Sequence, residues 1–422
     1  MSKVLGICDD RFQQVKQLFQ QYLTSSKELG ASLVINIDGE NVVDLWGGYA
    51  DISRVTGYIG GDVFVTINLH HPEYEWTFLV RDAERVVDIQ KQYPNTRVVQ
   101  GSLDSYELIV DEVARADIVL SELHPDFWTA LAAPSINWLT ARYADWADAD
   151  HKNAAEAIKT GMKKRTAPGF LIHTSGAGIL TVSDIHNGAF GTESPKLYND
   201  WDGVSEVTSL PDDAAHRDVD KIVIASNAEP SLIHTAIVCP PCIYGEGRGP
   251  GKRRSIQVPE MIRCTLERGK GFQVGQGRNK WRNVHIQDLS VVYLRLVEEA
   301  TKPDGGGATW GSEGYYFAES GEHYWGDVAQ AVANEACKLG IIKSSEIDSL
   351  DIENTEAIQP FGRYLWGTNS RHRAVRAKKV LGWELAGFPT LADEISRAVE
   401  AEAKRLRLVE PMRFQLQTWP LL

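Results

Sequence analysis

TGYIGGDV, residues 56–63, is the stretch of sequence that decides the fold. Gly57 and Gly60 stand three residues apart and lead into apolar positions. This pattern is typical of a turn from a strand into a helix, where a bare backbone lets a pyrophosphate approach the helix N-terminus. A complete dinucleotide fingerprint has another glycine three residues before Gly57, and this chain has Arg54 there. Two of the three glycines of a dinucleotide site are therefore present.

The composition indicates a globular protein of two or three domains that acts on a small molecule. The 422 residues, 43% of them hydrophobic, suffice for a substantial core. The net charge of -13 would repel nucleic acid and anionic membranes, so we expect neither as a partner. The five cysteines do not resemble a secreted disulfide framework, and the sequence shows neither a signal pattern nor a membrane-spanning run. We therefore expect a cytoplasmic protein and leave its oligomeric state open, with a homodimer among the alternatives.

The first 54 residues differ in character from the rest of the chain. Apolar residues at helical spacing predict a helix over 10–29, and two runs rich in β-branched residues, 32–37 and 41–46, predict a hairpin. From Cys8 to Asp51 the sequence resembles the opening of β-lactamase-like serine esterases. The chemistry of that family needs a Ser-x-x-Lys motif, which this chain nowhere contains. We therefore predict an extra helix and hairpin here, and no hydrolysis.

From residue 56 onward, strands and helices alternate, which is the pattern of a parallel sheet covered on both faces. We predict an α/β fold with a doubly wound, Rossmann-type sheet. Its predicted strands are 76–80, 97–100, 117–120, 170–174 and 235–238. The pattern is interrupted at 121–149, where three tryptophans crowd into a stretch without clear periodicity. This insertion is either a substrate lid or an irregular surface segment with buried tryptophans.

Polar side chains directly follow two of these predicted strands. Arg81 follows the first, at the place that faces the adenosine ribose in a Rossmann-type sheet, where an arginine suits a 2′-phosphate. Arg81 therefore favours NADP, while the neighbouring Asp82 and an ordinary surface charge are the alternatives. Thr174 and Ser175 stand at the end of the fourth strand, where a hydroxyl can polarise a substrate carbonyl by donating a hydrogen bond.

A Cys-x-x-Cys motif, from Cys239 to Cys242, encloses two prolines. The chain has no second pair of this kind to complete a metal site. We interpret the motif as a rigid turn with small buried thiols and predict no metal.

Four motifs follow one another along the chain: Gly57–Gly61, His173–Ser175, Pro240–Gly245 and Val284–Leu289. Together they resemble those of an extended or atypical short-chain dehydrogenase/reductase of the NAD-dependent epimerase/dehydratase type. The resemblance covers residues 55–395. It implies a Rossmann domain over 55–250, which includes the insertion, and a smaller C-terminal α/β substrate domain over 251–422.

The resemblance also implies a bound NADP, or NAD, and assigns residues to it. The residues that it places at the cofactor are Gly57, Tyr58, Ile59, Gly60, Arg81, Ser102 and Pro240. It places Thr174 or Ser175 near the nicotinamide. Ser102 departs from the family pattern, because members commonly have an acidic residue there that contacts adenine.

The catalytic pair of the family is replaced. Members with hydride or epimerase chemistry use a Tyr-x-x-x-Lys pair, in which the lysine lowers the pKa of the tyrosine. This chain has His216 and Asp220 in those places. A histidine and an aspartate four residues apart can share one face of a helix and act as a tuned acid and base. An ordinary surface pair is the alternative, and Tyr198 is a weaker substitute for the missing tyrosine.

These observations predict an NAD(P)-dependent oxidoreductase, or an enzyme with epimerase/dehydratase-like chemistry, that acts on a small molecule. The missing Tyr/Lys pair leaves a non-catalytic NAD(P)-binding regulator as an alternative. A further alternative is a chimera with an impaired nucleotide site, produced by gene fusion or by misplaced exon boundaries. The esterase-like start and the missing first strand suggest it. Because the first strand is normally central in a doubly wound sheet, we expect 33–37 or 42–46 to replace it if the site is intact.

Overall fold

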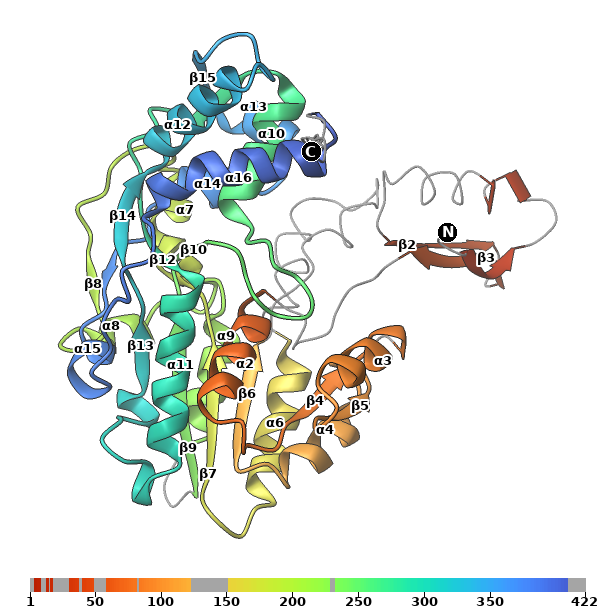
Figure 1. Ribbon diagram of the computed structural model, residues 1–422, viewed down its shortest axis with the longest axis vertical. Helices are drawn as coiled ribbons and strands as arrows, with labels where there is room; N and C mark the ends of the chain where they lie inside the picture. The colour runs from red at the N-terminus through yellow and green to blue at the C-terminus, as the bar shows by residue number, and fades with distance from the viewer. Residues whose placement is uncertain are drawn as a thin grey trace, which may run out of the picture.

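The computed structural model describes residues 4–8, 13–14, 16–17, 30–37, 40–48, 58–81, 83–122, 151–227 and 232–408 (Figure 1). Three predicted features lie wholly or mostly outside these ranges, namely Gly57, the helix over 10–29 and the insertion over 121–149. Of the glycine-rich stretch, the structure therefore describes the residues from Tyr58 onward.

Parallel strands form the larger layer of the fold, as the alternating pattern predicts. Their bounds are Thr77–Val80 (β4), Arg97–Gln100 (β5), Ile118–Glu122 (β6), Gly169–Thr174 (β7), Ile233–Cys239 (β9) and Tyr315–Phe317 (β13). Four of them form one sheet in the order β13-β9-β7-β6, and β4 pairs with β5 in a second sheet. The predicted α/β class is confirmed, and β5 coincides with a predicted strand.

Helices cover both faces of these strands. They are α2 (Tyr58–His70), α3 (Ala83–Gln92), α4 (Tyr106–Val113), α6 (Lys152–Lys163), α9 (Arg217–Ala225) and α11 (Ile286–Ala300). α2 packs against α11, while α6 contacts both α4 and α9 (Figure 1). Consecutive side chains at the end of β7 point to opposite faces of the sheet. Thr174 contacts α11 on one face, and Ser175 contacts α9 on the other.

The N-terminal residues form a sheet of their own. Its strands are β1 (Val4–Cys8), β2 (Gly30–Ile37) and β3 (Glu40–Gly48), antiparallel in the order β1-β3-β2. Neither 33–37 nor 42–46 takes the place of the first Rossmann strand in this structure, because β2 and β3 pair with each other in a separate sheet, so the first of the two alternatives expected from the sequence is not met here. Their short connection makes this antiparallel pairing local, whereas parallel strands need a long crossover.

The larger layer is consequently split between β4 and β6. Within the described residues, β4 bonds only to β5, and β6 bonds only to β7. The first strand of a doubly wound sheet belongs between these two and leads into the helix that corresponds to α2. No described strand stands in that place.

The C-terminal residues build a second hydrophobic core. α10 (Gln257–Arg268), α12 (Trp325–Lys338) and α16 (Leu391–Arg405) pack with β11 (Gly271–Val274). Residues 251–422, predicted as one substrate domain, are shared between the two cores, because α11 and β13 belong to the larger layer. The chain therefore crosses between the two cores more than once.

Shorter elements complete the fold. They are η2 (Ala177–Thr181), α7 (Val182–Asn187), β8 (Tyr198–Asn199), α8 (Val204–Thr208), β10 (Cys242–Tyr244), β12 (Lys280–His285), η3 (Pro303–Gly305), η4 (Gly311–Glu313), β14 (Gly321–Tyr324), β15 (Ile347–Leu350), α13 (Ile352–Ile358), α14 (Gly362–Gly367), β16 (His372–Arg373) and α15 (Arg376–Val380). In the ranges given above, no helix is both long enough and apolar enough to cross a membrane.

Candidate functional site

Several predicted cofactor residues lie at one edge of the larger layer. The carboxyl ends of parallel strands meet at a common edge, and ligands of α/β sheets bind there. Arg81, Ser175 and Pro240 directly follow β4, β7 and β9, and Ser102 comes two residues after β5. The carbonyl of Pro240 accepts a hydrogen bond from the backbone N of Ala177 at 2.9 Å, which ties β9 to the turn after β7.

The first turn of α2 suits an anionic group. The helix starts with Tyr58, Ile59 and Gly60, and its first turn contains no acidic side chain. The N–H groups at a helix N-terminus and the helix dipole both favour a phosphate. Gly60 has no Cβ, so a ligand can approach its backbone closely.

Tyr58 holds a loop against the start of α2. Its hydroxyl donates to the carbonyl of Gly245 at 2.7 Å, and burial raises the pKa of this phenol well above its usual value. A Cβ on Gly247 would come within 3.2 Å of the Tyr58 ring, so the two pack closely. We call the segment 245–255, between β10 and α10, the strap (Figure 1). Tyr58 directs its hydroxyl to the strap, and its predicted place at the cofactor stays a prediction.

A buried ion pair fixes the strap to α2. The fully buried carboxylate of Asp62 accepts hydrogen bonds from Arg248, at 2.7 Å from Nη2, 3.0 Å from Nε and 2.9 Å from the backbone N. Ser290 of α11 donates to the same carboxylate at 2.8 Å. These donors offset the large cost of taking a charge out of water. No local sequence pattern links the two members of this pair, which are 186 residues apart.

The ends of β4 and β5 carry Arg81 and Ser102, the residues predicted on the adenosine side. The carbonyl of Arg81 accepts from the side chain of Gln100 at 3.3 Å, which links the two strand ends. The hydroxyl of Ser102 accepts from the backbone N of Asp104 at 3.2 Å, and its own backbone N donates to Ser105 at 3.0 Å. Ser102 therefore closes a local turn, and its contact with adenine stays a prediction.

The two hydroxyl residues at the end of β7 face opposite sides of the layer. Thr174 Oγ1 lies 2.7 Å from the hydroxyl of Tyr293 on α11. Ser175 Oγ donates to Asp220 Oδ2 on α9 at 3.1 Å. The structure thus brings Ser175 to the helix that carries the predicted acid and base and leaves Thr174 on the other face.

Asp220 is the centre of a buried polar cluster. The same oxygen accepts from the hydroxyl of Tyr315 at 3.1 Å, and Oδ1 lies 3.9 Å from Nε2 of His173. The residue is 1% exposed, so its donors offset the desolvation of the carboxylate. Burial, together with the charge of Asp220, raises the pKa of Tyr315 well above its usual value, and the phenol keeps its proton. No sequence motif links Tyr315 to Asp220, which precedes it by 95 residues.

This geometry changes the role predicted for Ser175. A serine hydroxyl has a single proton, and here that proton points to Asp220. Ser175 therefore offers lone pairs to a bound group. The sequence suggested that Ser175 donates a hydrogen bond to a substrate carbonyl. It could do so only if its hydroxyl no longer donated to Asp220.

His216 lies over the turn that follows Ser175. Its backbone is left-handed, with φ 65° and ψ -10°, which is uncommon for a residue other than glycine. A Cβ built on Gly176 or Gly178 would lie 2.8 or 3.6 Å from His216 Nε2, so the ring covers both glycines. Backbone strain of this kind clusters at functional sites, where the surroundings enforce it. His216 and Asp220 thus reach the same turn from the start of α9.

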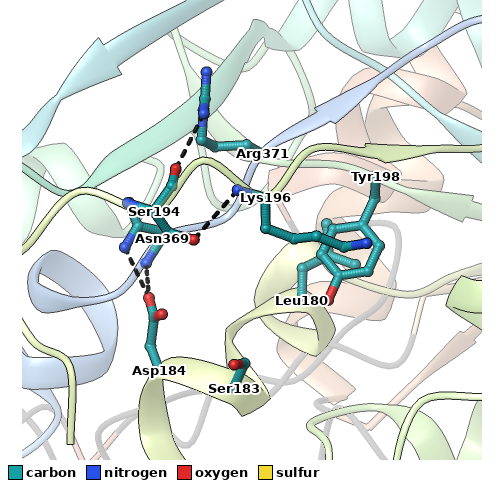
Figure 2. A pocket seen from close by; sticks show the side chains of 8 residues that line it. All are labelled: Leu180, Ser183, Asp184, Ser194, Lys196, Tyr198, Asn369 and Arg371. Carbon is teal, nitrogen blue, oxygen red and sulfur yellow. Dashed lines mark hydrogen bonds between the residues drawn. The ribbon is translucent and has the colours of Figure 1, made fainter. Parts of the chain in front are cut away.

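Tyr198, the substitute considered for the missing tyrosine, lines a cavity of about 240 Å³ (Figure 2). Nζ of Lys196 lies 4.8 Å from the centre of its ring. The other lining residues are Leu180, Ser183, Asp184, Ser194, Asn369 and Arg371. Both cations of the lining are paired, Lys196 with Glu206 and Arg371 with Glu322. Apart from Tyr198, the lining includes none of the residues predicted for catalysis or cofactor binding.

Cys239 and Cys242 lie at the end of β9 and the start of β10, and both are buried. Burial raises the pKa of both thiols, which makes them poor nucleophiles. The interpretation of the motif as small buried thiols is confirmed.

The described residues fit a dinucleotide. A helix N-terminus without an acidic side chain and Arg81 at the end of β4 supply donors along one edge, and Ser175 at the end of β7 supplies lone pairs there. These are the groups that a pyrophosphate, a ribose and a nicotinamide require. The strand before α2 and the first glycine are the parts that the described residues do not supply.

No family model matches the chain. Oxidase ucsJ from Acremonium sp is 36% identical to it over 362 residues, which make up 84% of this chain and 97% of that protein.

Solved structures share the fold at low sequence identity. A double mutant of DesIV, a dTDP-glucose 4,6-dehydratase from Streptomyces venezuelae, has a TM-score of 0.55 and 14% identity, covering 84% of this chain and 96% of its own. A UDP-glucose 4-epimerase from Thermotoga maritima has a TM-score of 0.53 and 15% identity, covering 83% and 97%. PbgP3 from Burkholderia pseudomallei has a TM-score of 0.55 and 16% identity, covering 85% and 98%. The fold is therefore that of Rossmann-type epimerases and dehydratases.

Proposed function

The chain is an enzyme of the family to which oxidase ucsJ of Acremonium sp belongs, and we propose that it is an NAD(P)-dependent oxidoreductase acting on a small molecule. The observation that carries the proposal is the meeting of His216, Ser175 and Asp220 at the sheet edge where nucleotides bind. The crystallised DesIV contains NAD, which supports a nicotinamide cofactor here.

Each group at this edge has a role in the proposal. NAD(P), when bound, would supply the hydride donor or acceptor. The first turn of α2 would bind its pyrophosphate, and Arg81 would lie at the adenosine ribose. His216 would take the substrate proton at Nε2, or return it, because an imidazole changes charge near neutral pH. Asp220 would hold Ser175, whose lone pairs would accept a hydrogen bond from the bound group.

We expect NADPH to bind at least about ten-fold more tightly than NADH, because Arg81 can bind a 2′-phosphate by charge-assisted hydrogen bonds. In calorimetric titrations of the full chain, Arg81→Ala should raise the Kd for NADPH about ten-fold or more and leave the Kd for NADH unchanged. Arg115→Ala, which removes an exposed arginine at the end of α4, is the control.

Other outcomes of this titration decide between the alternatives. Equal affinity for both nucleotides would assign Arg81 to the solvated surface. A folded chain that binds neither nucleotide would favour the chimera with an impaired site. NADPH binding without turnover of any carbonyl or alcohol would favour the non-catalytic regulator.

The position of His216 leads to another prediction. Gly176→Ala should lower turnover about ten- to hundred-fold, because its methyl group would displace the His216 ring, and a shift of about 1 Å at a catalytic group can cost this much. The backbone of Gly176 is extended, with φ -157°, so alanine adds no backbone strain. Gly178→Ala is the matched control, since its Cβ meets Nε2 at an ordinary 3.6 Å. Steady-state kinetics would check this, and equal losses in the two variants would contradict it.

We favour oxidoreduction over epimerase/dehydratase-like chemistry because the relative at 36% identity is named an oxidase, whereas the dehydratase and the epimerase share the fold at 14% and 15% identity. We also propose that the segment 8–51 derives from a β-lactamase-like esterase and has no catalytic role here. The absence of a Ser-x-x-Lys motif supports this.

A further inference from the structure

The strands β4 and β6 belong to one layer although they do not pair. Leu79 of β4 and Val119 of β6 pack against the same hydrophobic core. The helices that follow β5 and β6, α4 and α6, also pack against each other. The split therefore separates two strands that lie over a common set of helices.

Two backbone edges border this split. Within the described residues, β4 has β5 as its one partner and β6 has β7. Edges inside a layer are costly, because buried N–H and C=O groups need hydrogen-bond partners. Ser121 of β6 is also buried, and its hydroxyl has no partner among the described residues. Among the described residues, the layer lacks one strand at this place.

The properties of the missing strand follow from its neighbours. It must run parallel to β4 and β6, because a right-handed crossover through α2 then leads to β4. Its length should match the four residues of β4 and the five of β6. A parallel strand covered on both faces is a continuous apolar run.

Among the strands of the N-terminal sheet, β1 meets these requirements. Its five residues, Val-Leu-Gly-Ile-Cys, include no polar side chain. β2 contains Ser32 and Asn36, and β3 contains Asn41 and Asp44, as expected for strands with a solvated face.

β1 is also the strand that the N-terminal sheet can release most easily. In the order β1-β3-β2 it is an edge strand with one partner. Its departure leaves the pairing of β2 with β3 intact. Moving β2 or β3 would break that hairpin.

We propose that Val4–Cys8 exchanges between the edge of the N-terminal sheet and the place between β4 and β6. There it completes one parallel sheet and the nucleotide site. In the inserted arrangement the carboxyl end of β1 lies beside the start of α2. Because NAD(P) binding is the predicted consequence, this inference rests in part on the proposed function. Bound nucleotide and strand insertion then favour each other.

Proline variants test the exchange, since proline is tolerated in an edge strand but not between two partner strands. Leu5→Pro should raise the Kd for NADPH at least about ten-fold and lower the Tm. Val43→Pro, in the middle strand of the N-terminal sheet, is the matched control and should leave the Kd unchanged. An unchanged Kd in Leu5→Pro, or a larger rise in Val43→Pro, would overturn the proposal.

Hydrogen exchange of the unmodified full chain tests the exchange without relying on nucleotide binding. Peptides that cover residues 4–8 should exchange at least about ten-fold more slowly than those of β2, because insertion gives β1 two partner strands. Exchange as fast as that of β2 would overturn the proposal even if NADPH binds. Slow exchange in a chain that binds no nucleotide would support the strand insertion and count against the proposed function alone.

Discussion

Replacing His216 by alanine should lower kcat by about 10²- to 10⁴-fold, the range that a general acid or base contributes. His216 is the imidazole that covers the turn after Ser175, and its left-handed backbone holds the ring there. The KM and the Kd for NADPH should change little, because the proposal gives His216 no part in binding. Steady-state kinetics and nucleotide titration of the same preparation would check both expectations.

His186→Ala is the control for this variant. His186 lies on α7, is 48% exposed and pairs with Asp213 at 2.7 Å. Its loss should leave kcat within about two-fold of the original, since an exposed pair contributes little. A His216→Ala enzyme with unchanged kcat would remove His216 from the mechanism and leave the base unassigned.

Replacing Arg248 by alanine should destabilise the protein by about 3 kcal/mol, the lower end of the range for a buried pair that loses one partner. The carboxylate of Asp62 is fully buried and would lose the two side-chain donors of Arg248, Nε and Nη2, while the backbone N of residue 248 would remain. Arg248 itself is 32% exposed, which places the expected value at that lower end. Urea unfolding at neutral pH would measure the change in the free energy of unfolding.

Arg253→Ala is the matched control on the same strap. Arg253 pairs with Glu246, and both side chains are 56% exposed, so its loss should cost at most about 1 kcal/mol. The double variant Arg248→Ala with Asp62→Ala should recover part of the stability, because it no longer buries an uncompensated charge. Equal losses for Arg248→Ala and Arg253→Ala would show that solvent reaches Asp62.

Local patterns in the sequence predict the strands and their ends well. The strand 97–100 coincides with β5, and 170–174 differs from β7 by one residue. Both predictions rest on β-branched runs with clear stops, which depend on neighbouring residues alone. The four-residue spacing of His216 and Asp220 does not by itself place the pair, because His216 precedes α9 with a left-handed backbone and both side chains reach the end of β7 by tertiary contacts.

Contacts between distant segments could not be predicted in this way. Tyr315 reaches Asp220 from β13, and Arg248 reaches Asp62 from the strap, although neither has a distinctive local pattern. Ser175 directs its proton to Asp220, which is also a tertiary contact. The sequence therefore suggested a hydrogen-bond donor where the structure has an acceptor. The hairpin of β2 and β3 was predicted, but whether one of its strands also takes the place of the missing first strand is a choice between partners, which periodicity does not decide.

The strap has a mechanical consequence. Tyr58 and Asp62 fasten it to α2, and the strap leads directly into α10 of the second core. The helix that would bind the pyrophosphate and the core built from the C-terminal residues are therefore coupled by a short, anchored link. A tilt of the second core would therefore displace the first turn of α2. A ligand bound at the second core would change the position of the helix that is proposed to bind the pyrophosphate.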